Sequence, residues 1–217
     1  MDDILDERIE EDNLSDRDIF TNIWTSPRQI LKYINDNRYN KYVTILLLLE
    51  GISGAFNRAY IKDLGEYMYL WGIILVCVFL GGPLGWILYY IYAASLSWTG
   101  RWLKGQGNKS SLLTMLSYAM TPLIVALIFF ILQIIIYGHQ LFVPYKDFIN
   151  GGLTSYIFIY GSTGIRLFSE ILTIIFCVIG VSEVQKFSIA KSILNLLLAA
   201  LVMFVPIFII ATLVRTF

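Results

Sequence analysis

The sequence is poor in the residues that build most catalytic and metal sites. Its 217 residues include one histidine, two cysteines and five prolines, and only 15% are charged. Cys77 and Cys177 lie about a hundred residues apart inside apolar runs, so neither a metal site nor a disulfide framework is indicated. The single histidine, His139, follows an apolar segment, which favours an interfacial position over a catalytic one.

Common catalytic motifs are missing as well. The sequence has no HExxH metal motif, no Gly-x-Ser-x-Gly nucleophile turn and no aspartates paired on facing segments as in an intramembrane protease. The stretch "GQGNKSS" at residues 105–111 lacks the spacing of a phosphate-binding loop and follows no strand. We therefore expect a protein that is not an enzyme and that has no cofactor, no metal and no nucleic-acid partner.

Apolar residues, in contrast, are abundant. They make up 57% of the chain, and the mean hydropathy is +0.68, whereas a soluble domain is about 45–50% apolar. Since helices satisfy their own backbone hydrogen bonds in lipid, the composition predicts an all-α polytopic membrane protein. The acidic start does not resemble a cleavable signal peptide, so the first membrane segment is expected to act as an uncleaved signal.

Five transmembrane segments are expected where about 20 apolar residues run between charges. They cover residues 42–59, 68–98, 112–137, 167–182 and 189–214. The second is longer than a bilayer core requires, so we expect one long helix kinked at Gly81, Gly82 and Pro83, with two half-helices as the alternative. Pro122 and Pro206 predict kinks in the third and fifth segments.

Two further regions precede these segments. Residues 1–18 hold nine acidic residues and two arginines, so residues 1–20 are predicted to be a disordered cytoplasmic arm. In residues 21–41, Ser26 and Pro27 can start a helix that carries Ile30, Leu31 and Ile34 on one side. We expect this amphipathic helix to lie on the membrane surface, ahead of a five-span domain over residues 42–217.

Basic residues predict the orientation. The following nine fall on one side of the five segments: Arg28, Lys32, Arg38, Lys41, Arg101, Lys104, Lys109, Lys186 and Lys191. The other side has five: Arg58, Lys62, Lys146, Arg166 and Arg215. Because cytoplasmic loops carry the excess of lysine and arginine, the N-terminus is predicted to be cytoplasmic and the C-terminus extracytoplasmic.

A few polar residues lie inside the apolar segments, where an ionised group costs roughly 2.5–3.5 kcal/mol on insertion scales. These candidates for an intramembrane polar site are Glu50, Ser53, Gln133 and Asn195. Glu50 is about 12 Å from the start of its segment, too deep to reach the surface, so it should face inward. An intramembrane enzyme would need a second carboxylate or a histidine close to Glu50, and the sequence places none there.

Two further polar features are expected near these segments. Arg166 and Glu170 have the i, i+4 spacing of an ion pair on one helix, near the outer face. Gly51 and Gly54, behind Glu50, would let a neighbouring helix approach closely. A candidate cytoplasmic face for a partner or for lipid comprises Arg101, Lys104, Lys109, Glu183, Lys186 and Lys191.

Three stretches together resemble a known family. They are "IWTSPRQIL", "YYIYAASLSWTGRWLKGQGNKSSLLTMLSYAMTPLI" and "IGVSEVQKFSIAKSILNLLL", and in this order they look like bacterial members of the Yip (Ypt-interacting protein) superfamily. The resemblance implies five spans, a cytoplasmic N-terminus and a location in a bacterial inner membrane. Eukaryotic relatives bind Rab-type GTPases, but their "DLYGP" signature is absent from the N-terminal arm, so GTPase binding is not carried over.

Two functions are left open by the sequence, besides a disfavoured enzyme. The first is a non-enzymatic scaffold or adaptor of the Yip type that holds partner proteins or organises the membrane. The alternative is a lipid or small-solute translocator that uses Glu50 in a polar crevice. The expected partners are membrane lipids and a protein bound through the arm or the loops, and the oligomeric state is not determined.

Overall fold

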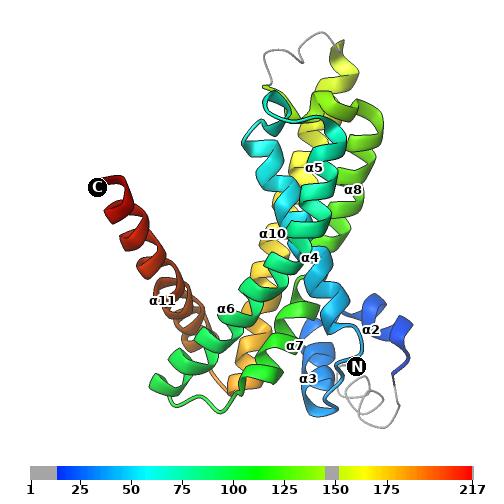
Figure 1. Ribbon diagram of the computed structural model, residues 1–217. Helices are drawn as coiled ribbons and strands as arrows, with labels where there is room; N and C mark the ends of the chain where they lie inside the picture. Colours follow the sequence, from blue (N-terminus) through cyan, green and yellow to red (C-terminus); the bar gives the residue numbers. More distant parts are fainter. Residues whose placement is uncertain (1–13, 145–151, 217) are drawn as a thin grey trace. The chain divides into compact units, whose positions relative to one another are not determined.

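The computed structural model describes the backbone of residues 14–144 and 152–216 and the side chains of residues 14–144 and 160–205. Within these ranges every regular element is helical and no strand occurs, as the sequence predicts for an all-α protein. The chain divides into two compact units, whose helices are labelled in Figure 1. Unit 1 comprises residues 1–43, 89–119 and 175–217, and unit 2 comprises residues 44–88 and 120–174.

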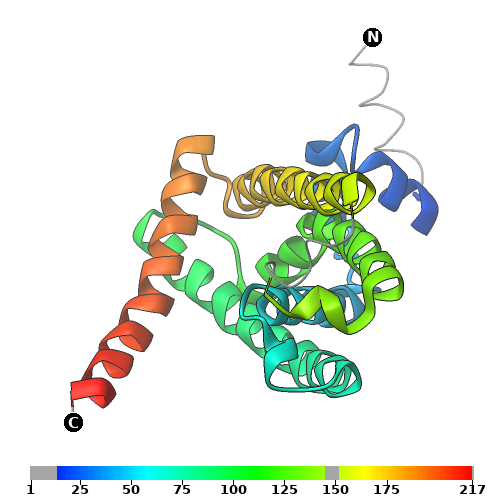
Figure 2. The ribbon, with the colours of Figure 1, turned by 90° about the horizontal axis from the view of Figure 1, so that it is seen from above.

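The helices divide between the units as follows. Unit 1 contains α2 (Asp16–Asn22), α3 (Pro27–Asp36), α7 (Lys109–Ala119), α11 (Ile189–Thr216) and the later parts of α6 (Gly82–Trp102) and α10 (Gly152–Gln185). Unit 2 contains α4 (Val43–Ile61), η1 (Leu64–Glu66), α5 (Leu70–Val76), η2 (Cys77–Gly81), α8 (Thr121–Tyr137), η3 (Gly138–Phe142) and the earlier parts of α6 and α10. Figures 1 and 2 show α4, α8 and α10 lying alongside one another in unit 2.

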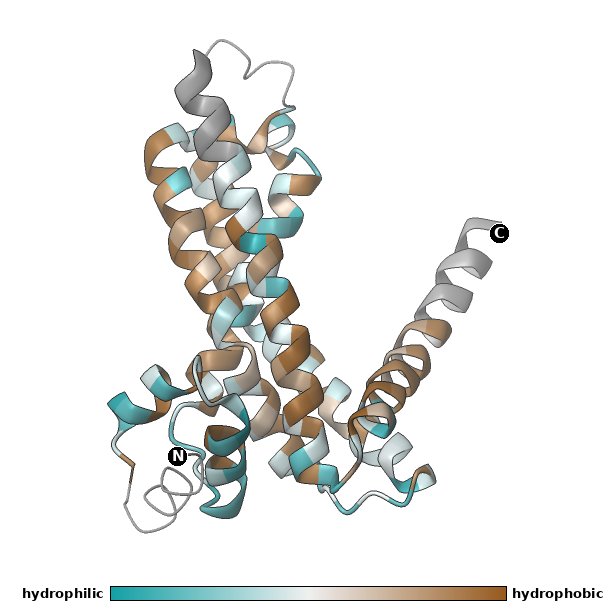
Figure 3. Cartoon of the chain, turned by 180° about the vertical axis from the view of Figure 1, so that it is seen from behind, coloured by the Kyte–Doolittle hydropathy of each residue, from teal (hydrophilic) through white to brown (hydrophobic). Residues whose placement is uncertain are grey.

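Three stretches of the described residues are long and apolar enough to cross a membrane. They are Leu70–Trp102, Thr121–Phe142 and Tyr160–Gln185, and Ile189–Val205 is a shorter apolar helix. In Figure 3 the helices of unit 2 are mostly brown, whereas teal residues gather in the N-terminal helices. The first expected segment corresponds to α4, which is not among the three, so the count of five spans stays a prediction.

The long apolar segment contains a π-helical turn. The α-helical pattern holds over Leu70–Val76, gives way to η2 at Cys77–Gly81, and resumes with α6 at Gly82. Pro83 has no N–H to donate and its ring crowds the carbonyl one turn before it, and a π turn accommodates such a mismatch. The irregularity therefore lies just before Gly82 and Pro83.

Two expected segments differ from the helices observed. The third, residues 112–137, is two helices, because α7 ends at Ala119 and α8 begins at Thr121. Pro122 stands in the first turn of α8, where a missing N–H costs nothing, so it starts a helix instead of bending one. The fourth is part of α10, which already begins at Gly152. α11 continues through Pro206, and the kink expected there stays a prediction.

The apolar face of α3 is covered by protein. Ile30, Leu31 and Ile34 are at most 1% exposed, and α3 contacts α7 within unit 1. Arg28, at the start of α3, also forms an ion pair with Glu183 at 3.1 Å. We expected this face to rest on lipid because no protein surface for it was evident in the sequence. The correction follows from α7, whose buried residues supply that surface.

Asp16 fastens α2 to the same unit. Its carboxylate accepts a hydrogen bond of 2.6 Å from the Tyr39 hydroxyl and is also bonded by Lys41 and the Tyr42 hydroxyl. Residues 16–20, which we assigned to the arm, therefore belong to a docked helix. Residues 1–13 lie outside the described residues.

Replacing Asp16 by asparagine is expected to loosen α2. Hydrogen bonds from Lys41, Tyr39 and Tyr42 hold the pKa of Asp16 well below its ordinary value. Because the folded-state pKa is lowered, the stabilisation is complete above the unfolded value of about 3.9 and is lost only as the pH falls below it. Hydrogen exchange at pH 7 should be faster over residues 16–22 in Asp16→Asn and unchanged in Asp36→Asn, an exposed control on α3. Equal exchange in the two variants would contradict the role of Asp16.

Candidate functional site

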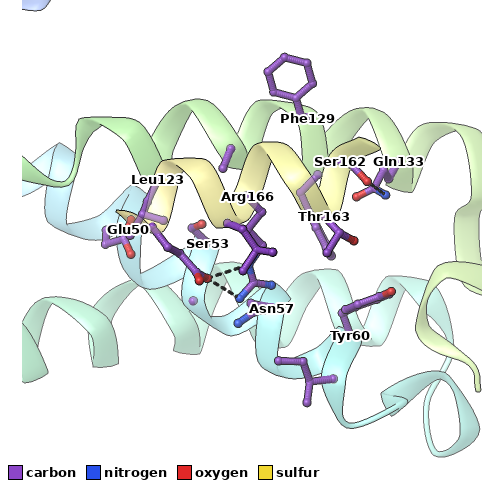
Figure 4. Close-up of a pocket in the computed structure, with 16 residues that line it drawn as sticks. Glu50, Ser53, Asn57, Tyr60, Leu123, Phe129, Gln133, Ser162, Thr163 and Arg166 are labelled. Atoms are coloured by element: carbon purple, nitrogen blue, oxygen red, sulfur yellow. Dashed lines mark hydrogen bonds and ion pairs between the residues drawn. The ribbon is translucent and has the colours of Figure 1, made fainter. Parts of the chain in front are cut away.

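Unit 2 contains a pocket of about 320 Å³ between α4, α8 and α10 (Figure 4). α4 contributes Glu50, Ser53, Gly54, Asn57, Tyr60 and Ile61. α8 contributes Leu123, Ala126, Phe129, Phe130 and Gln133. α10 contributes Ser162, Thr163, Arg166, Leu167 and Glu170. On each helix these residues recur mainly at intervals of three or four, so each helix turns one face toward the pocket.

The inner wall of the pocket is polar and buried. Glu50 is 5% exposed and Gln133 is 6% exposed. The side-chain amide of Gln133 donates a hydrogen bond of 2.6 Å to the Ser162 hydroxyl, which links α8 to α10. Oδ1 of Asn57 is buried and accepts no hydrogen bond within the described part of the chain. The wall therefore combines a carboxyl group, amides and hydroxyls in a region where apolar side chains would be expected.

An ion pair completes the polar lining. Arg166 donates from Nε and Nη2 to the same oxygen of Glu170, at 3.0 and 2.9 Å, as the dashed lines in Figure 4 show. The pair has the i, i+4 spacing noted in the sequence, and both side chains are partly exposed. Two of the five N–H groups of the guanidinium are used in these bonds, which leaves three for another acceptor.

The exposed part of the lining, called the mouth below, is mainly apolar. Ile61 at the end of α4, Phe129 on α8 and Leu167 on α10 line the pocket and are exposed, and Thr163 is an exposed polar residue beside them. In a membrane the three apolar side chains would contact hydrocarbon. The pocket therefore combines buried polar groups with a mainly apolar exposed lining.

The structure brings together three of the four residues expected to form the intramembrane polar site. Glu50, Ser53 and Gln133 line the pocket, whereas Asn195 belongs to unit 1 and is not among the lining residues. There, Oδ1 of Asn195 accepts a hydrogen bond of 2.8 Å from Thr99, and its amide donates to the Leu96 carbonyl at 3.4 Å. Asn195 therefore joins α11 to α6.

Other lining residues were not assigned to this site from the sequence. Asn57 falls one turn beyond Ser53, and the spacing along α4 could have indicated it. Arg166 and Glu170 were expected as an ion pair, but nothing in the sequence placed α10 opposite α4. As a result Glu170 is a second carboxylate in the pocket of Glu50, which the sequence did not predict.

The glycines behind Glu50 lie against the second apolar segment. A Cβ atom at Gly51 would lie 2.6 Å from the Gly81 carbonyl oxygen and 2.9 Å from the Gly85 Cα. A Cβ atom at Gly54 would meet nothing within 4 Å, because Gly54 faces the pocket. α4 therefore presents a close helix contact at Gly51 and the pocket at Gly54.

The candidate cytoplasmic face lies in unit 1. There, Gln185 at the end of α10 is hydrogen-bonded to the Gly-rich loop at Gly107 and to α6 at Leu96. Gln185 is 1% exposed, accepts a hydrogen bond of 2.9 Å from the Gly107 N–H and donates one of 3.2 Å to the Leu96 carbonyl. Of the six residues of this face, Glu183 pairs with Arg28 and Lys109 lies over the Tyr90 ring. The other four are exposed: Arg101, Lys104, Lys186 and Lys191.

The histidine and the two cysteines lie outside the pocket lining. His139 is hydrogen-bonded to the Met68 carbonyl at 3.2 Å and is not a lining residue. Across the described residues, histidine, cysteine, aspartate and glutamate do not gather in a group of three or more that could hold a metal ion. Cys77 and Cys177 are both buried, and neither forms a disulfide bond.

Comparison with known proteins identifies the family. No curated protein and no solved structure matches the chain. The family model of the Yip1 domain matches residues 21–210, which include all of unit 2, most of unit 1 and all the residues that line the pocket. This match agrees with the resemblance carried by the sequence motifs, and the apolar helices agree with a membrane protein. The chain belongs to the Yip1 domain family.

Proposed function

We propose that this Yip-family protein is a non-enzymatic lipid translocator that takes a membrane lipid into the pocket of unit 2. One observation carries the proposal: the buried carboxyl group of Glu50 and the Arg166–Glu170 ion pair line a single pocket that has a mainly apolar mouth. Polar groups inside a membrane segment are costly and commonly mark substrate pathways. A lipid headgroup can fill the polar part while its acyl chains remain in hydrocarbon.

A purely structural role for these residues accounts for less. Polar side chains that only hold helices together are expected to bond with one another and to leave no space between them. Gln133 and Ser162 follow this pattern, and so do Arg166 and Glu170. The pocket nevertheless remains, and the acceptor atom of Asn57 is buried at its wall.

Filling the pocket is expected to abolish lipid movement. Gly54→Leu would place a side chain in the open space beside Gly54, whereas Gly54→Ala adds one methyl group. In proteoliposomes that contain a fluorescent phospholipid, quencher added outside should reach the inner leaflet fast with the wild type and Gly54→Ala, and at the rate of empty vesicles with Gly54→Leu. Equal rates for Gly54→Leu and Gly54→Ala would argue against the pocket as the path.

The scaffold or adaptor function is the second candidate, and unit 1 supplies the observation in its favour. The Asp16 contacts and the Arg28–Glu183 ion pair hold α2 and α3 in unit 1, so these two helices present a fixed surface to a protein partner. This function is favoured if neither Gly54 variant changes lipid movement and removal of residues 1–13 releases a protein partner in mild detergent.

We also propose the five-span topology with a cytoplasmic N-terminus. The nine basic residues that we assigned to the cytoplasmic side all belong to unit 1, and four of the other five belong to unit 2. A reporter inserted at residue 106 should be cytoplasmic, and one fused after Phe217 should be extracytoplasmic, because five spans separate the ends of the chain. Both reporters in one compartment would rule out the five-span arrangement.

A further inference from the structure

We infer that the pocket of unit 2 selects a zwitterionic phospholipid whose headgroup carries a primary ammonium, the chemistry of phosphatidylethanolamine. The inference rests on the proposed lipid-binding function and adds the headgroup class. It follows from the signs of the charges around the pocket and from the donors and acceptors that they supply.

The charged groups in the lining are two carboxyl groups and one guanidinium. Glu170 is held by Arg166 through two hydrogen bonds, so the positive charge of Arg166 is already balanced on its own helix. Glu50 lies on a different helix, α4, and adds the third charged group. With all three ionised, the lining carries a net charge of −1. A zwitterionic headgroup leaves this net charge unchanged and can place its ammonium beside Glu50. A lipid with a net negative charge would instead add to an excess of the same sign.

The pocket also holds a site for phosphate. Three N–H groups of Arg166 remain beyond the two that bond Glu170, and a guanidinium binds phosphate oxygens well. Figure 4 shows Glu50 and Arg166 in the same pocket, on opposing helices. A headgroup with an anionic and a cationic end can therefore place its phosphate at Arg166 and its ammonium toward Glu50.

The hydrogen-bonding groups favour a primary over a quaternary ammonium. Glu50 and the Asn57 Oδ1 atom are acceptors in the lining. A primary ammonium has three N–H donors for such acceptors, whereas the trimethylammonium of phosphatidylcholine has none. Desolvating the Glu50 carboxylate is expensive unless a donor of opposite charge replaces the water. Soluble phosphoethanolamine, which has no acyl chains, is expected to bind weakly, because the exposed side chains of Ile61, Phe129 and Leu167 at the mouth would stay uncovered.

Native mass spectrometry of the detergent-solubilised full chain tests the inference. Phosphatidylethanolamine, phosphatidylcholine and phosphatidylglycerol with identical acyl chains are added in equal amounts, and bound lipid is counted for the wild type and three variants. Glu50→Gln keeps the shape and removes the charge, and Gly54→Leu fills the pocket. Glu66→Gln removes an exposed carboxylate of unit 2 that does not line the pocket and is the matched control.

The wild type and Glu66→Gln should retain phosphatidylethanolamine roughly tenfold better than the other two lipids, the ratio expected for one charge-assisted hydrogen bond. Glu50→Gln should lose this preference while remaining monodisperse with an unchanged melting temperature. Gly54→Leu should lose the bound lipid of every class. Soluble phosphoethanolamine should not displace the lipid at the same concentration.

The other outcomes distinguish the headgroup assignment from the proposed lipid-translocating function. Binding that Gly54→Leu abolishes, but that shows no preference for phosphatidylethanolamine or keeps its preference in Glu50→Gln, would overturn the headgroup assignment and leave the lipid pocket standing. Displacement by phosphoethanolamine would overturn the assignment to a lipid. Binding that Gly54→Leu does not affect would overturn both the assignment and the lipid-translocating function.

Discussion

Gly51→Ala is expected to destabilise the protein by about 3 kcal/mol, the upper end of the usual cost of overpacking a core. The added Cβ would lie 2.6 and 2.7 Å from the carbonyl oxygens of Gly81 and Gly82 and 2.9 Å from the Cα of Gly85. All three are backbone atoms, so no rotation of a side chain can relieve the contact, and α4 must move away from α6. The melting temperature in detergent and the recovery of monodisperse protein on size exclusion measure this effect.

Two further substitutions test the Gly51 contact, one from the opposite helix and one as a control. Gly85→Ala should be similarly harmful, because its Cβ would lie 2.2 Å from the Gly51 Cα on the other side of the same contact. Gly54→Ala is the matched control on α4, where the new Cβ meets open space. It should be neutral or stabilising by up to about 1 kcal/mol through its better helix propensity. A Gly51→Ala protein as stable as Gly54→Ala would show that the helices do not cross at this point.

Gln185→Ala is expected to cost about 3 kcal/mol in unit 1, through lost hydrogen bonds and the cavity left behind. The side chain is buried and bonds the Gly107 N–H and the Leu96 carbonyl. Gly100, Gly105 and Gly107 surround it so closely that a Cβ on any of them would lie within 3.0 Å of its carboxamide. Removing the side chain would leave the Gly107 N–H without its acceptor and would free the Gly-rich loop from α10.

Two further variants separate the loss of hydrogen bonds from the loss of volume. Gln185→Met nearly conserves the volume, so its cost of roughly 1–3 kcal/mol measures the hydrogen bonds alone. Gln106→Ala, at an exposed glutamine of the same loop, should stay within about 0.5 kcal/mol of the wild type. Thermal unfolding in detergent gives the order of the four proteins, and an equal loss in Gln106→Ala and Gln185→Ala would contradict the structural role of Gln185.

The helices could be predicted from the sequence where apolar runs end at charges. α4 and α11 begin within one residue of the expected starts at 42 and 189. The same criterion failed at Met120, because a break between two apolar helices leaves no mark in hydropathy. It also placed the start of α10 too late, since the polar residues between 152 and 166 lower the hydropathy of a helix that continues through them.

The candidate site could also be predicted only in part from the sequence. The sequence pointed to Glu50, Ser53 and Gln133 because polar groups are conspicuous in apolar segments, and it pointed to the Arg166–Glu170 pair because i, i+4 neighbours meet on any helix. It could not show that these two features form one pocket, nor that Asn195 bonds Thr99 and Leu96 in unit 1. Contacts between helices depend on how the helices are rotated and paired, and single-segment patterns do not contain that information.

Local features therefore follow from the residues alone: an all-α, strongly apolar chain, its approximate helix boundaries, and the residues that are costly to bury. Which surfaces those helices bury depends on how the helices pack together. The apolar face of α3 illustrates the reason, because the same stripe of Ile30, Leu31 and Ile34 would suit lipid or protein equally well. In the structure α7 packs against α3. The close contact between Gly51 and Gly85 sets how α4 lies against α6, and the position of α10 gives Glu50 a pocket that it shares with Arg166.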